Sequence, residues 1–157
     1  MDRLVYKKMS LFDAPEGANI LHACNAKGVW GSGIAAEMRV RYPKAYAQYK
    51  QFCSEGNKVG QFLSSHWENH SVYSIITSYN YGSNVETPSK ILVNTAIAIS
   101  HLAAWGTSKG QDLVIYSNKF NSGLFKVSWK DTEYVILKVL EMCPGLTWIV
   151  CDPNMEE

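Results

Sequence analysis

The chain has 157 residues, 46% of them hydrophobic, and its 15 Lys and Arg side chains nearly balance 14 Asp and Glu side chains. The length suits one domain with a sizeable buried core, so we expect a single domain over residues 1–157. The balanced charge argues against direct binding to nucleic acid or to anionic membranes.

The ends of the chain and its cysteines bear on where the protein works. Residues 1–8 have no apolar segment behind their positive charges, and no apolar run reaches membrane-spanning length. The four cysteines, Cys24, Cys53, Cys143 and Cys151, form no C-x-x-C pair, which is typical of free thiols in a reducing compartment. We therefore expect a cytoplasmic protein without membrane contact.

The N-terminal third predicts two strands followed by helices. Apolar runs at residues 4–6 and 19–24 predict strands joined by a turn, because Pro and Gly lie between them. A helical pattern begins at Gly33. Pro43 interrupts it, and a second helix continues to Gly56.

The middle of the chain predicts a hairpin and then a loop. Residues 61–64 and 72–77 have the composition of strands, with Glu68 and Asn69 in the turn between them. Residues 79–86 contain Gly and Asn and predict a loop.

The C-terminal half alternates helices with strands. We expect a helix over residues 89–105, a buried strand over 113–116, a helix over 129–142 and a final strand over 146–151. Residues 118–125 form a second loop of small and polar residues between a strand and a helix. The whole pattern predicts a layered α/β fold with a central mixed sheet.

The glycine-containing stretch after the second strand is the first candidate site. Gly31 and Gly33 lie where this strand gives way to a helix. Glycines let backbone amides approach a ligand, and a helix N-terminus favours phosphate. Two alternatives stay open: a dinucleotide-binding fingerprint, Gly31-x-Gly33-x-x-Ala36, and a plain tight turn.

The loop at residues 121–126 is the second candidate site. It also follows a strand and precedes a helix. Ligands of α/β sheets bind outside the carboxyl ends of the strands, so two such loops can face one crevice. Together they predict a site that holds a diphosphate from both sides.

These stretches carry a family resemblance that covers nearly the whole chain. The resemblance lies in His22-Ala23-Cys24-Asn25, Gly31-Ser32-Gly33-Ile34-Ala35, Tyr42-Pro43-Lys44-Ala45 and Asn121-Ser122-Gly123-Leu124-Phe125 with Trp129-Lys130. In this order they resemble the macro domain family, most closely its small ADP-ribose-1″-phosphate phosphatases of the yeast type. The resemblance implies a three-layer α/β/α fold with a central mixed sheet.

The resemblance also implies where a ligand binds. By position, Ser10 and Leu11 flank the adenine, the two glycine loops hold the diphosphate, and Asn25 contacts the distal ribose. The expected ligand-binding residues are Ser10, Leu11, Ala23, Cys24, Asn25, Trp30, Gly31, Ser32, Gly33, Ile34, Ala35, Asn121, Ser122, Gly123, Leu124, Phe125 and Lys126. We expect no cofactor and no metal, and a monomer whose partner is a small ADP-ribose derivative.

Three positions depart from the family pattern. Met9-Ser10-Leu11 stands where many macro domains have Gly-Asp-Ile, whose aspartate grips adenine, and Asp152 is a positional candidate to replace it. Ser32 replaces a glycine of the first loop. His22 stands where most of the family has the first asparagine of Asn-Ala-Ala-Asn, and a histidine there is shared with the phosphatase branch. The sister enzymes that remove ADP-ribose from protein carboxylates have a lysine near Ser78 and an aspartate at Phe125, so that activity is not expected.

Two residues are the candidates for catalysis. An imidazole ordinarily titrates near neutrality, and His22 stands at a strand end, so it is a candidate for proton transfer; the alternative is a histidine that only orders the loop. Asn25 can orient a water or a hydroxyl group. Cys24 lacks the surroundings of a phosphatase nucleophile and is interpreted as a core residue. His66 and His70 with Glu68 are interpreted as a surface turn rather than a zinc site.

The expected function is therefore metal-independent hydrolysis of ADP-ribose-1″-phosphate to ADP-ribose and phosphate. Two alternatives stay open. One is a module that binds ADP-ribose without turning it over. The other is a hydrolase of O-acetyl-ADP-ribose or of ADP-ribosyl esters.

Overall fold

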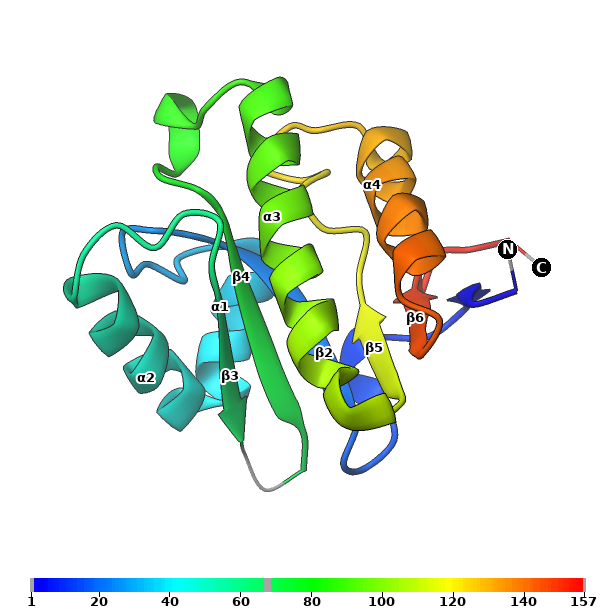
Figure 1. Ribbon diagram of the computed structural model, residues 1–157. Helices are drawn as coiled ribbons and strands as arrows, with labels where there is room; N and C mark the ends of the chain where they lie inside the picture. The colour runs from blue at the N-terminus through cyan, green and yellow to red at the C-terminus, as the bar shows by residue number, and fades with distance from the viewer. Residues whose placement is uncertain (1, 67–68, 157) are drawn as a thin grey trace.

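The computed structural model describes residues 2–66 and 69–156 and shows one mixed sheet (Figure 1). Over these residues the strand order is β1-β6-β5-β2-β4-β3. Neighbouring strands from β1 to β4 run parallel, and β3 alone pairs antiparallel, at the edge beside β4. The strands are β1 Leu4–Lys7, β2 Asn19–Asn25, β3 Phe62–His66, β4 Ser71–Ser78, β5 Leu113–Ser117 and β6 Leu146–Cys151.

Four α-helices cover the two faces of this sheet. α1 (Gly33–Arg41) and α2 (Pro43–Ser54) pack on one face. α3 (Pro88–Gly106) and α4 (Trp129–Met142) pack on the other and lie in front of the sheet in Figure 1. Pro43 and Pro88 open α2 and α3 at positions where a missing N–H costs little. The expected three-layer α/β/α arrangement with a mixed sheet is confirmed.

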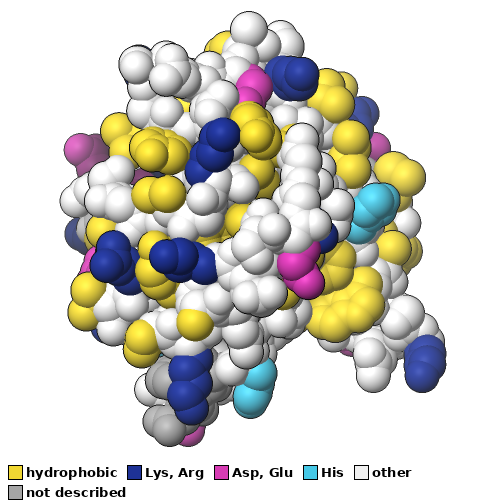
Figure 2. Space-filling model, turned by 90° about the vertical axis from the view of Figure 1, so that its left-hand side faces the viewer, with side chains coloured by type: hydrophobic (Ala, Val, Ile, Leu, Met, Phe, Trp, Pro, Cys, Tyr) yellow, Lys and Arg dark blue, Asp and Glu magenta, His cyan; other side chains and the backbone are white. Residues whose placement is uncertain are grey.

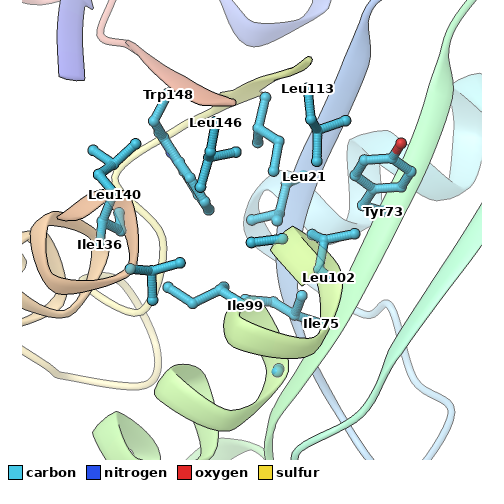
Figure 3. Packing of buried hydrophobic residues seen from close by; sticks show 14 of the residues in the cluster. Leu21, Tyr73, Ile75, Ile99, Leu102, Leu113, Ile136, Leu140, Leu146 and Trp148 are labelled. Atoms are coloured by element: carbon cyan, nitrogen blue, oxygen red, sulfur yellow. The ribbon is translucent and has the colours of Figure 1, made fainter. Parts of the chain in front are cut away.

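Two apolar cores hold the layers together, and β2 contributes to both because successive side chains of a strand point to opposite faces. Leu21 packs with Ile99 of α3 and Trp148 of β6, as Figure 3 shows. Its neighbour Ile20 packs towards α1 and α2, near Met38. Each such side chain contributes about 1.5–3 kcal/mol when fully buried. β2 is therefore fixed on both faces up to its carboxyl end.

The connection between β1 and β2 contains the predicted turn and more. In the sheet, β6 and β5 lie between the two strands, and residues 8–18 with a 3₁₀ helix at Leu11–Asp13 make the connection. A tight turn joins antiparallel neighbours, whereas β1 and β2 belong to the parallel part of the sheet. The predicted turn is present at residues 15–18, where the Ala18 amide donates to the Pro15 carbonyl at 3.0 Å, but it does not pair the two strands.

The hairpin prediction is confirmed, because β3 and β4 pair antiparallel with Phe62 opposite Ile75. Glu68, placed in its turn, lies outside the described residues. The predicted loop at 79–86 includes a 3₁₀ helix, Gly82–Asn84.

The surface view adds two observations. On the side of α2 and β3, basic and acidic side chains lie dispersed among apolar and uncharged ones (Figure 2). Within the described ranges, no helix combines the length and the apolar character needed to span a membrane.

Candidate active site

The loops that follow β2 and β5 meet at one cavity. β2 and β5 are parallel neighbours, so their carboxyl ends lie at the same edge of the sheet. The cavity there has a volume of about 410 Å³, within the usual range for a small-molecule site. Its walls are formed by Ala23, Cys24, Asn25, Val29, Trp30, Gly31, Ser32, Gly33, Ile34, Ala35, Tyr81, Gly82, Asn118, Lys119, Phe120, Asn121, Gly123, Leu124 and Phe125.

Asn25 organises the first loop through its side-chain amide. Its Nδ2 donates to the carbonyl of Val29 (2.7 Å), and its Oδ1 accepts from the amides of Lys27 (3.0 Å) and Val29 (3.3 Å). The Tyr49 hydroxyl donates to both the carbonyl and the Oδ1 of Asn25. The amide therefore shapes the loop, and its contact with a ligand remains a prediction.

An aromatic stack supports the same loop from below. Trp30 is 1% exposed and stacks on Tyr49 of α2, with ring centroids 5.0 Å apart and an interplanar angle of 22°. Tyr46 lies on the same indole, 5.1 Å away. This stack joins the cavity wall to α2 and fixes the point from which α1 begins.

The N-terminus of α1 opens onto the cavity. Ser32 is the N-cap, but its side chain makes no capping hydrogen bond, and Gly33 adopts a φ of +60° that favours glycine. The first amides of a helix have no partner within the helix and carry partial positive charge. Gly33, Ile34 and Ala35 line the cavity, so this end of α1 offers donors to an anion.

The second loop is held by a buried polar network around Asn121. Its Oδ1 accepts from the Thr77 hydroxyl of β4 (3.0 Å), and its Nδ2 donates to the Thr95 hydroxyl of α3 (2.9 Å) and to that of Thr132 of α4 (3.5 Å). The Asn121 backbone has a φ of +67°, which Asn tolerates better than most residues. Three separate elements thus position this loop.

A third segment, which follows β4, completes the wall. Tyr81 and Gly82 follow β4, the neighbour of β2. Glu86 fixes the base of this segment, because its carboxylate accepts from the Ser78 hydroxyl and the Tyr79 amide. Burial acts to raise the pKa of Glu86, but these hydrogen bonds outweigh it and lower the pKa. The sequence signal for this segment was its position directly after the strand β4, at the edge of the sheet where ligands bind.

His22 does not fit the predicted proton-transfer role. Its side chain is fully buried, lies outside the cavity wall, and is hydrogen-bonded through Nε2 to Ser74 Oγ at 3.0 Å. Burial lowers its pKa to about 3, so the imidazole is neutral near pH 7. Its ring contacts Trp30 edge-on at 4.7 Å. The geometry favours the alternative, in which His22 orders the first loop through its contact with Trp30.

Cys24 lines the cavity, and burial raises the pKa of its thiol, which keeps it protonated. This placement is consistent with the interpretation of Cys24 as a residue without a nucleophilic role.

Four predicted ligand-binding residues lie outside the cavity wall. Ser10 caps the 3₁₀ helix by accepting from the Phe12 amide, and the Leu11 side chain is buried in the core beside α1 and α2. The Ser122 hydroxyl donates to the Lys119 carbonyl, and Lys126 is exposed with a φ of +60°. Val29, Tyr81, Gly82, Asn118, Lys119 and Phe120 also line the wall.

The remaining histidines of the rejected zinc motif have structural partners. His70 is hydrogen-bonded to the Tyr42 hydroxyl (2.6 Å) and to the carbonyl of Ala14 (3.0 Å), and His66 to the Ser71 hydroxyl. Glu68, the third residue of that motif, lies outside the described residues.

Comparisons with known proteins give relatives and structural neighbours, whereas no protein-family model matches the chain. A protein of Aspergillus clavatus named ADP-ribose 1''-phosphate phosphatase is 30% identical over 97% of this chain and 95% of its own length. The macrodomain of Mycobacterium tuberculosis DarG has a TM-score of 0.79 at 16% identity, covering 96% of this chain and 98% of that one. Thermosipho africanus DarTG, solved in complex with ADP-ribose, has a TM-score of 0.80 at 12% identity, covering 100% of this chain and 43% of that one.

Proposed function

This chain belongs to the ADP-ribose 1''-phosphate phosphatase family of macrodomains, and on that premise we propose that it hydrolyses ADP-ribose 1''-phosphate to ADP-ribose and phosphate. The observation that carries the proposal is the meeting of two phosphate-compatible loops at one cavity. The N-terminus of α1 supplies unpaired amides on one side of the cavity, and the loop fixed by Asn121 forms the opposite side.

The proposed ligand lies across the ends of β5 and β2. Its diphosphate lies between the two loops, where amides and a helix dipole favour anions. The distal ribose and its phosphate lie towards Asn25 and the first loop. Trp30 gives this end of the cavity a rigid floor through its contacts with Tyr46 and Tyr49.

The chemistry asks mainly for positioning and charge stabilisation. A water oxygen bonds to phosphorus, the bond between phosphorus and the ribose oxygen breaks, and that oxygen leaves with a proton. Amides aimed at the phosphoryl oxygens stabilise the charge that they carry in the transition state. The Ser32 hydroxyl, which makes no capping bond to α1, is available to orient the water or the phosphoryl group. His22 takes no part in proton transfer in this scheme because it is buried below the wall.

The direct test is phosphate release from ADP-ribose 1''-phosphate, followed alongside the appearance of ADP-ribose. We expect release that persists with a chelator, since backbone amides perform the electrostatic role. Calorimetric binding of ADP-ribose without any release would instead support a binding module. Release of acetate from O-acetyl-ADP-ribose, with the phosphate ester left intact, would redirect the function to carboxylic esters.

We also propose a monomeric single domain that works in the cytoplasm. The four cysteines are all free thiols, which supports a reducing compartment. Light scattering on the purified protein tests the oligomeric state, and fractionation of cells that express it tests the compartment.

A further inference from the structure

We propose that Lys119 recognises the negative charge of the ligand and that Asp152 holds the lysine in place for this role. The inference rests on the proposed function, because it concerns the same cavity. Among the described residues of the cavity wall, Lys119 is the only one with a charged side chain. An ADP-ribose 1''-phosphate ligand carries charge on its diphosphate and on its terminal phosphate.

The sheet brings the two residues together. Lys119 lies two residues beyond β5, and Asp152 directly follows β6. β5 and β6 are parallel neighbours, so both residues emerge at the edge of the sheet that carries the cavity. The Lys119 Nζ lies 2.9 Å from Asp152 Oδ2.

Further contacts restrict how the lysine can move. The Asp152 Oδ1 accepts from the Asn154 amide at 3.0 Å, which fixes the carboxylate. The Lys119 Nζ lies 5.9 Å from the centre of the Tyr6 ring, within range of a cation–π contact. The Lys119 carbonyl accepts from the Ser122 hydroxyl, which links its backbone to the second loop. Lys119 is thus held at two points, its carbonyl by Ser122 and its ammonium group by Asp152.

The strand order assigns this lysine to one end of the ligand. The first loop follows β2 and the Tyr81 segment follows β4, whereas Asp152 follows β6, on the other side of β5. Lys119 therefore lies at the end of the cavity away from Asn25. A diphosphate between the loops lies within reach of this end, and the terminal phosphate lies towards the other. Lys119 should consequently act on ligand affinity rather than on bond cleavage.

A local cation matters because the chain as a whole has a formal net charge of only +1. Such a protein exerts little long-range attraction on an anion, so the charge has to be recognised inside the cavity. The side chain of Lys119 is 40% exposed while Asp152 holds its ammonium group, so the side chain is open to a ligand in the cavity.

The experiment measures the Kd of ADP-ribose by calorimetry, at low and moderate salt, for the wild type and Lys119→Met, Lys119→Arg and Lys130→Met. We expect Lys119→Met to weaken binding about tenfold and to reduce its salt dependence, because a charge-assisted contact is lost. Lys119→Arg should restore most of the affinity. Lys130→Met removes the same charge from an exposed site on α4 and should bind like the wild type. In turnover of ADP-ribose 1''-phosphate, Lys119→Met should raise KM and leave kcat unchanged.

Asp152→Asn separates the two partners. Asn keeps an acceptor for the lysine but loses the charge that holds it, so ADP-ribose binding should weaken about twofold, less than in Lys119→Met. Unchanged affinity and salt dependence in Lys119→Met would overturn the proposal, as would a loss of affinity in Asp152→Asn equal to that in Lys119→Met, since the carboxylate would then contact the ligand itself. These binding results do not depend on phosphate release, so this inference and the phosphatase activity can fail separately.

Discussion

The two loops that form the cavity are held in different ways. The first loop is ordered by its own residue Asn25 and by the indole of Trp30, which stacks on α2. The second is ordered by Asn121, which is hydrogen-bonded to side chains of β4, α3 and α4. One loop thus depends on a local turn over an aromatic stack, and the other on long-range polar contacts. The two should respond differently to substitution.

The largest effect is expected at the aromatic support of the first loop. Trp30→Ala removes a fully buried indole that contacts Tyr46, Tyr49 and His22, and should lower the free energy of unfolding by about 4 kcal/mol. Trp30→Phe keeps a stacked ring, so its free energy of unfolding should fall by less than half of that amount. Denaturant unfolding measures both. Equal losses would show that the stack itself contributes little.

The second loop should be sensitive through hydrogen bonding instead of apolar packing. Asn121→Ala leaves the Thr77 and Thr95 hydroxyls without their partner and puts Ala at a positive φ, so the free energy of unfolding should fall by about 3 kcal/mol.

Asn121→Gly is the matched variant, because Gly tolerates the same φ but also removes the network. It should be about 1 kcal/mol more stable than Asn121→Ala. If the two variants are equally stable, the backbone conformation at this position carries no cost and the network explains the whole effect.

A pH dependence of stability is expected from His22, the β2 residue beneath the first loop. The pKa of His22 is about 3 in the folded protein, below its usual 6.5, because burial disfavours the charged form. The unfolded chain therefore binds a proton first as the pH falls. The stability that neutral His22 provides is complete above pH 6.5 and is lost progressively down to about pH 3. Between pH 7 and pH 5 the loss should be about 2 kcal/mol.

His22→Gln is the control for this effect, since it keeps a polar group near Ser74 but does not titrate. Unfolding free energies measured from pH 7 to pH 5 should fall less steeply in this variant than in the wild type. Parallel slopes for the two proteins would assign the pH dependence to other groups and would contradict the buried, neutral state of His22.

The contrast between the loops also explains what the sequence could predict. α4 and β6 match their predicted bounds, because apolar periodicity and the Pro144-Gly145 break are local signals. The first loop was located by a local signal as well, the glycines Gly31 and Gly33 between a strand and a helix. The turn before β2 was predicted from Pro15 and Gly17, but the separation of β1 from β2 by β6 and β5 was not, since the neighbours of a strand depend on the whole sheet.

The site shows the same division between local and global information. The Asn121 network, the burial of His22, and the arrival of Lys119 and Tyr81 at the wall all depend on elements far apart in the chain. A single sequence gives no distance between such elements. What it did indicate was the edge of the sheet at which they meet, because the loops follow parallel strands.

The smallest expected effect compares one glycine from each loop. Gly33 has a φ of +60°, whereas Gly123 lies outside the left-handed region, and a Cβ at either position would meet no atom within 4 Å. Gly33→Ala should therefore cost about 1 kcal/mol through backbone strain alone, and Gly123→Ala less than about 0.5 kcal/mol. Thermal and denaturant unfolding measure both. If Gly123→Ala were the more damaging of the two, backbone strain at the positive φ of Gly33 would not be the reason for the difference, and the N-terminus of α1 would not depend on this glycine.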